Sequence, residues 1–215
     1  MRLICYSFLA WPLLACSLQD PNLEELRRLC EKDAGVNIYR SVDADGYYNG
    51  SVPETSFLEL IKSDFEFIEF CDDNPLQNEL LEGPGCGRMT RAPKSSGRCH
   101  PWLQKILDES YPEPYVRFRQ DYCVQFESIP VATARYSFQT DLKAWQPKGG
   151  EGEFTRVRAW ITDTNYSELM GEYISYSFNP NPGSSASRSC YHLDSKYSSY
   201  RDANFVNRIL VQSGN

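Results

Sequence analysis

The chain has few of the residues on which most enzymatic chemistry depends. Its 215 residues include only two histidines, His100 and His192, so any histidine-based mechanism must use one of them. No Gly-x-Ser-x-Gly elbow is present to expose a nucleophilic serine, and no Cys-x-x-Cys pair offers thiolates to zinc. These absences argue against the common hydrolase and zinc-finger patterns. We therefore expect no catalytic residue, no metal and no cofactor.

Long apolar runs and an excess of positive charge are also missing. The one apolar stretch, residues 3–15, is shorter than the ~20 residues that a membrane-spanning helix needs. Acidic residues outnumber basic residues by 29 to 22, and the formal net charge is −7. A general nucleic-acid binder carries the opposite charge, so we expect no nucleic acid among the partners. The hydrophobic content of 41% is typical of a globular domain.

The N-terminus is typical of an export signal. Arg2 precedes the apolar stretch, and Leu13-Leu14-Ala15-Cys16 resembles the lipobox of bacterial lipoproteins, in which the signal is cut before a cysteine that is then acylated. We predict a signal peptide over 1–15 and a short lipid-anchored tether over 16–19. The membrane is then a partner through acyl groups, such as palmitate, on Cys16.

The residue after Cys16 is Ser17 rather than Asp, which favours the outer membrane by resemblance to enterobacterial sorting rules. The expected location is therefore the cell envelope, on the periplasmic or the surface side of the outer membrane. A plain signal peptide followed by secretion is the alternative.

Cysteine parity agrees with lipidation. Of the eight cysteines, cleavage removes Cys5 and acylation consumes Cys16. The remaining six can pair fully in an oxidising compartment. These disulfide candidates are Cys30, Cys71, Cys86, Cys99, Cys123 and Cys190. We predict one pair, Cys86 with Cys99, because it would close a loop rich in glycine and proline. The Cys/His pairs at Cys99-His100 and Cys190–His192 fit no standard zinc spacing.

From residue 20 to 215 the pattern predicts a single α+β domain. Asp20-Pro21 is a typical helix start, and 202–212 carries apolar residues at helical spacing. The second half is rich in β-branched and aromatic residues. We predict an antiparallel sheet from the second half, packed against N- and C-terminal helices, with disulfide-stapled loops.

Individual segments follow from alternation and turn residues. The clearest is a hairpin of 155–163 and 169–178. A helix is expected at 101–110, a helix followed by a strand within 55–70, a loop at 43–51 and an irregular excursion at 72–101. Further strands are expected at 36–42, 115–119, 122–128 and 131–140.

The segment Cys30-Glu31-Lys32-Asp33-Ala34-Gly35-Val36-Asn37-Ile38-Tyr39 resembles a group of uncharacterised proteobacterial lipoproteins. Those proteins carry a cysteine, a Lys-Asp-Gly-Gly-like turn and a Val-Tyr strand just past the signal. Ala34 replaces the first glycine of that turn. They also carry a later strand pair, which 158–164 and 169–176 resemble here, and a downstream cysteine, as at Cys190. The resemblance implies location and architecture but no chemistry.

Two exposed segments are candidate binding regions, the loop 179–189 and the locally basic stretch 88–98. We expect a lipid-anchored envelope protein of a Gram-negative bacterium that binds an envelope protein or polymer, or supports envelope structure. One alternative is an envelope lipoprotein hydrolase, for which Asp72-Asp73 or Glu66 with Glu69 would supply paired carboxylates.

The other alternative is a plain secreted, disulfide-stabilised binding protein. In a eukaryotic host, Asn49 and Asn165 would then be glycosylation acceptors.

Overall fold

The computed structural model describes residues 20–50, 53–73, 80–110, 116–181, 187–193 and 204–212. Within them lie six α-helices and a mostly antiparallel sheet. The helices are α1 (Pro21–Asp33), α2 (Pro53–Lys62), α3 (Pro101–Ser110), α4 (Val116–Asp121), α5 (Cys190–Leu193) and α6 (Asn204–Ile209), with a 3-10 turn at Lys94–Ser96. The strands are β1 (Gly35–Ile38), β2 (Val42–Ala44), β3 (Gly46–Asn49), β4 (Phe67–Asp72), β5 (Gly85–Pro93), β6 (Tyr122–Ile129), β7 (Tyr136–Trp145), β8 (Glu153–Asp163), β9 (Glu168–Asn179), β10 (Arg188–Ser189) and β11 (Leu210–Gln212).

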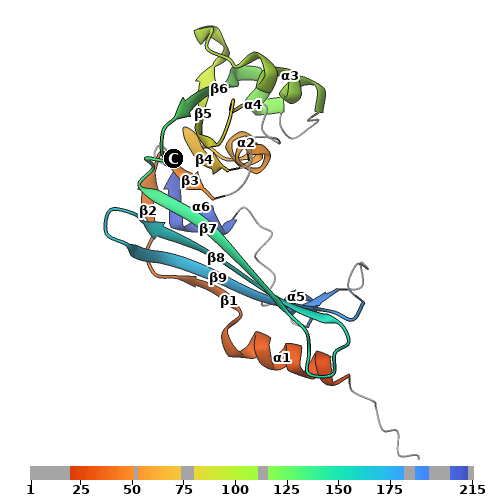
Figure 1. The fold of residues 1–215 in the computed structure, drawn as a ribbon. Helices are drawn as coiled ribbons and strands as arrows, with labels where there is room; N and C mark the ends of the chain where they lie inside the picture. Colours follow the sequence, from red (N-terminus) through yellow and green to blue (C-terminus); the bar gives the residue numbers. More distant parts are fainter. Residues whose placement is uncertain are drawn as a thin grey trace, which may run out of the picture.

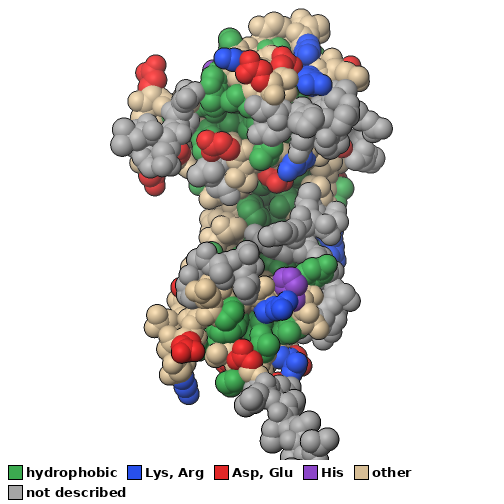
Figure 2. All heavy atoms as spheres, turned by 90° about the vertical axis from the view of Figure 1, so that its right-hand side faces the viewer, with side chains coloured by type: hydrophobic (Ala, Val, Ile, Leu, Met, Phe, Trp, Pro, Cys, Tyr) green, Lys and Arg blue, Asp and Glu red, His purple; other side chains and the backbone are tan. Residues whose placement is uncertain are grey.

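One sheet of nine strands runs through the molecule in the order β1-β9-β8-β7-β3-β4-β5-β6, and β10 adds to β9. The short strand β3 is parallel to both of its neighbours, whereas the other pairs are antiparallel. Two lobes result (Figure 1): β4–β6 with α2, α3 and α4, and β7–β9 with β1, α1 and α5. A narrower waist joins them, and charged side chains of both signs are scattered over the visible face (Figure 2).

The N-terminal helix forms as its capping residues predict. The Asp20 carboxylate accepts a hydrogen bond from the Asn22 amide at 2.9 Å, and Pro21 opens the helix. Leu26 and Cys30, four residues apart, are buried against Phe154, Tyr176 and Phe178 of the sheet. The helix therefore covers one end of the β8–β9 hairpin.

The larger core lies between the sheet and α2, α3 and α6. Its members come from both halves of the chain: Tyr47, Leu60, Ile68, Phe70, Met89, Leu103, Leu107, Ile161, Phe205 and Ile209 are among its buried side chains. The predicted α+β class, with a mostly antiparallel sheet, flanking helices and stapled loops, is confirmed.

The sheet also includes strands from the first half of the chain, because β1, β3, β4 and β5 belong to it. Three local predictions are wrong. Part of the segment 72–101, predicted as irregular, is β5, which pairs along its length with β4 and β6. The predicted loop at 43–51 contains β3. Most of the predicted strand 115–119 lies in α4 instead, where Phe118 is buried and packs on Tyr122.

Two further boundaries shift. The C-terminal helix ends at Ile209, and Leu210–Gln212 forms β11, which pairs in parallel with β2. The strand expected at 131–140 begins at Tyr136. The helix at 101–110 and the hairpin of β8 and β9 are confirmed.

Candidate binding surface

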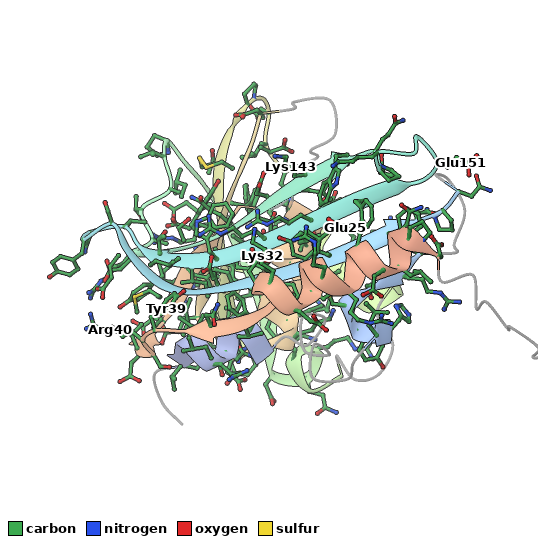
Figure 3. All side chains as sticks on the ribbon, turned by 90° about the horizontal axis from the view of Figure 1, so that it is seen from below. Glu25, Lys32, Tyr39, Arg40, Lys143 and Glu151 are labelled. Atoms are coloured by element: carbon green, nitrogen blue, oxygen red, sulfur yellow. A yellow bond between two sulfur atoms is a disulfide. The ribbon has the colours of Figure 1, made fainter. Side chains whose placement is uncertain are left out.

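Strands β7, β8, β9 and β1 present a polar row on the same face of the sheet that α1 partly covers. The register places Gln139 opposite Trp160, Trp160 opposite Glu172, and Glu172 opposite Asn37. Side chains directly opposite one another share a face, so these four form a line across four strands. Seen from below, α1 runs under one side of these strands and Tyr39 lies beyond its C-terminal end (Figure 3).

Glu172 organises the centre of this surface. Its Oε1 accepts a hydrogen bond from the Tyr39 hydroxyl at 3.0 Å, and its Oε2 accepts one from Arg158 Nε at 2.9 Å. The Arg158 guanidinium lies 5.0 Å from the centre of the Trp160 ring. We call these four residues, Tyr39, Arg158, Trp160 and Glu172, the Glu172 patch. Arg40, the residue after Tyr39, forms a separate exposed ion pair with Glu168 at 3.2 Å.

The patch combines fixed geometry with access to solvent. The Glu172 side chain is only 15% exposed, while Tyr39 is 58% exposed. The hydrogen bond to Glu172 raises the pKa of the Tyr39 hydroxyl above its usual value. A phenol and an indole, held in place by an ion pair, offer apolar surface and hydrogen bonds at low cost in conformational entropy. Such an arrangement suits recognition of a ligand.

Glu66 and Glu69, one pair of carboxylates considered for catalysis, lie in different surroundings. Glu66 is exposed, whereas the Glu69 side chain is fully buried in β4. Burial by itself would raise the pKa of Glu69, but hydrogen bonds from Arg88 and from the amides of Ala134 and Thr133 outweigh it and lower the pKa. Glu69 is thus an ionised anchor that ties the segment between β6 and β7 to β4.

The two histidines lie in different surroundings. His100 is partly buried with its ring 5.8 Å from Phe126, and burial lowers its pKa. The Nδ1 atom of His192 accepts a hydrogen bond from the Ser189 amide at 3.1 Å and lies 2.9 Å from the Ser189 hydroxyl. A side chain in the first turn that reaches back to the amide before the helix is typical of a capping box. The contact between Ser189 and His192 is therefore a helix cap at the start of α5.

The six candidate cysteines form three disulfides in the structure. Cys30 pairs with Cys190, Cys71 with Cys86, and Cys99 with Cys123. The predicted pair of Cys86 with Cys99 is wrong, because Cys86 lies directly opposite Cys71 in the β4–β5 ladder. Within the described residues, no cluster of three or more His, Cys, Asp or Glu side chains is arranged to hold a metal ion. Cys16 lies outside the residues that the structure describes.

Of the two segments expected to bind, the structure describes all of the basic stretch and part of the loop. In the basic stretch, Arg88 pairs with Glu69, and Arg91 binds the Ser63 carbonyl and packs on Phe118 and Tyr122. In the loop 179–189, residues 182–186 lie outside the described part of the chain.

The candidate glycosylation site at Asn49 is 1% exposed, so the folded chain does not present it, whereas Asn165 is exposed.

The members of the Glu172 patch were not singled out from the sequence. The hairpin was predicted, but the register that brings Arg158, Trp160 and Glu172 together follows a register shift between Ile161 and Thr162, for which the sequence pattern gave no signal.

Comparison with known proteins identifies no relative of this chain. No family model, no curated protein and no solved structure matches this chain. Among the described residues, no helix is long and apolar enough to cross a membrane. The resemblance to uncharacterised proteobacterial lipoproteins therefore stays a prediction from the sequence.

Proposed function

We propose that this chain is a lipid-anchored envelope protein of a Gram-negative bacterium that acts by binding. Cys16 carries the lipid, and the Glu172 patch contacts the ligand. The observation that carries the proposal is the ordered, solvent-facing array of Tyr39, Glu172, Arg158 and Trp160. Its polar groups are held in place before any ligand arrives, which lowers the entropic cost of binding.

The disulfides support an export route. All six cysteines downstream of Cys16 are paired, and structural disulfides persist in the periplasm and outside the cell rather than in the cytosol. The helix α1 begins at Pro21, five positions after Cys16, so a lipid on Cys16 would hold the lobe of β7–β9 near the membrane surface. Outer-membrane location, based on Ser17, is part of the same proposal.

The ligand that best fits the patch is a glycan strand of the envelope. The apolar face of a sugar ring packs on an aromatic side chain such as Tyr39, and its hydroxyls match the amide and carboxylate groups of Gln139, Asn37 and Glu172. A strongly anionic polymer is disfavoured because the chain carries a net charge of −7. The open face of a sheet also suits a long polymer better than a small molecule, which needs an enclosed site.

Co-sedimentation with purified cell-wall sacculi tests this function. We expect the wild-type protein to pellet with the sacculi, and the variants Tyr39→Ala and Glu172→Gln to remain largely in the supernatant. Tyr191→Ala is the matched control, because Tyr191 is a 56% exposed tyrosine on α5, outside the patch. Equal sedimentation of all four proteins, or none by the wild type, would rule out glycan binding through this patch.

A further inference from the structure

Strand β7 has a free edge over most of its length. On one side it pairs with β8 from Tyr136 to Trp145. On the other side it meets β3 only at Ser137 and Phe138. Within the described residues no strand pairs with the outer edge beyond these two positions, and residues 139–144 are all exposed. Figure 3 shows Lys143 along this margin of the sheet, on the side away from α1. Such an edge is a template for pairing with another strand.

The backbone groups that point outward can be identified. The Phe138 carbonyl accepts a hydrogen bond from the Gly50 amide at 2.9 Å on the β3 side. Because successive residues of a strand direct their N–H and C=O groups to opposite sides, Thr140, Leu142 and Ala144 direct theirs to the same open edge. Leu142 is also 68% exposed, which is unusual for a leucine in the middle of a strand.

The charges along this edge are complementary to those along the same edge of a second copy. Asp141 and Lys143 flank Leu142 and share one face of the sheet. If a second copy pairs antiparallel with Leu142 opposite Leu142, each Asp141 lies opposite a Lys143. A register shifted to centre on Asp141 or on Lys143 would place two like charges opposite each other, which is unfavourable.

We propose that two copies of this chain associate through the β7 edges, antiparallel and centred on Leu142. The two Leu142 residues exchange both backbone hydrogen bonds, and Thr140 of each copy pairs with Ala144 of the other. The contact is isologous, as expected for a two-fold dimer. Because the two-fold axis is perpendicular to the sheet, the α1 helices of both copies lie on the same side of the joined sheet. Two lipidated N-termini would then face one membrane together.

The interface is small, so we expect a dimer that dissociates on dilution rather than an obligate one. Sedimentation velocity of the full mature protein in mild detergent measures this association. We expect Asp141→Lys and Lys143→Asp each to weaken the dimer on the order of tenfold, because each replaces two attractive pairs with two repulsive ones. The double variant Asp141→Lys/Lys143→Asp should restore association.

Glu151→Lys is the matched control for the charge change, since Glu151 is exposed in the turn between β7 and β8. It should leave the dimer unchanged. A wild-type protein that stays monomeric at every concentration would overturn the proposal. So would a dimer that is indifferent to both single charge reversals.

A cross-link tests the register independently of the charges. Leu142→Cys places two thiols across the axis at the ~5.5 Å Cα separation of a hydrogen-bonded pair, within the range for a disulfide. We expect a covalent dimer joined at position 142 under mild oxidation, identified by peptide mass. Thr140→Cys is the control, because the two copies of that position are offset by ~13 Å along the strands. Equal cross-linking of both variants would contradict the register.

Discussion

Cys30 in α1 and Cys190 at the start of α5 are joined by a disulfide, although 160 positions separate them in the sequence. Their Cα atoms lie 5.5 Å apart, and both side chains are buried against Phe154 and Phe178. This bond fastens the helix that follows the proposed anchor to the far end of the hairpin sheet. Of the three disulfides, this one closes the longest loop.

Loss of this bond should therefore have the largest effect on stability. In the chain-entropy account, Cys30→Ser/Cys190→Ser lowers the free energy of unfolding by about 5 kcal/mol, against about 3 kcal/mol for Cys71→Ser/Cys86→Ser. The two losses of stability differ because the Cys71–Cys86 disulfide closes a loop of only 15 positions. Urea unfolding of the two double variants measures both values. A larger loss for the Cys71/Cys86 variant would contradict the role assigned to the long loop.

Glu69 should be a strong determinant of stability at neutral pH. Its carboxylate accepts hydrogen bonds from Arg88, Thr133 and Ala134, and the amide introduced by Glu69→Gln has only one oxygen to accept them. We expect this substitution to cost about 2 kcal/mol, a moderate value because Arg88 remains partly in water. Urea unfolding measures the cost. Glu66→Gln is the control and should change stability by less than about 0.5 kcal/mol, since Glu66 is exposed.

The same group gives a pH dependence with a defined sign. The pKa of Glu69 is lower in the folded chain than its usual value. Its contribution to stability is therefore fully present above the usual pKa and is lost as the pH falls through the lowered folded value. Thermal melting between neutral pH and acid should show a shallower loss of stability for Glu69→Gln than for the wild type. Parallel curves would mean that Glu69 does not titrate as described.

Gly46 should tolerate no side chain. It lies at the start of β3 opposite Phe67, and a Cβ there would fall on the Phe67 carbonyl oxygen and ring. We expect Gly46→Ala to destabilise the fold by about 1–3 kcal/mol through overpacking. Gly149→Ala is the control, because a Cβ at Gly149 meets no atom within 4 Å. Chemical denaturation of both variants measures the contrast, and equal stability would contradict the close β3–β4 approach.

The elements that were predicted correctly have local signals. The cap at Asp20 and the apolar spacing of Leu26 and Cys30 specify α1, and alternation around a short turn specifies the β8–β9 hairpin. Strand β5 has no such signal, because its glycines and Pro93 are typical of loops. It becomes a strand through pairing on both sides with β4 and β6, a long-range effect.

The candidate site divides in the same way. Arg158, Trp160 and Glu172 come from one hairpin that the sequence predicts, but the register that brings them together follows a register shift next to Ile161 that the sequence pattern does not specify. Tyr39 reaches the patch only because β1 pairs with β9, more than a hundred residues away. The disulfide partners were unpredictable for the same reason, since they depend on which strands become neighbours.

The central claim is that the chain is an oxidised, lipid-anchored envelope protein. The intact mass of the mature protein from its native host, with and without reduction and alkylation, tests it most directly. The account predicts a chain that starts at Cys16, carries acylglycerol, and has six cysteines that react only after reduction. A lipid-free mass, or a cysteine that reacts without reduction, would contradict the anchor or the full pairing.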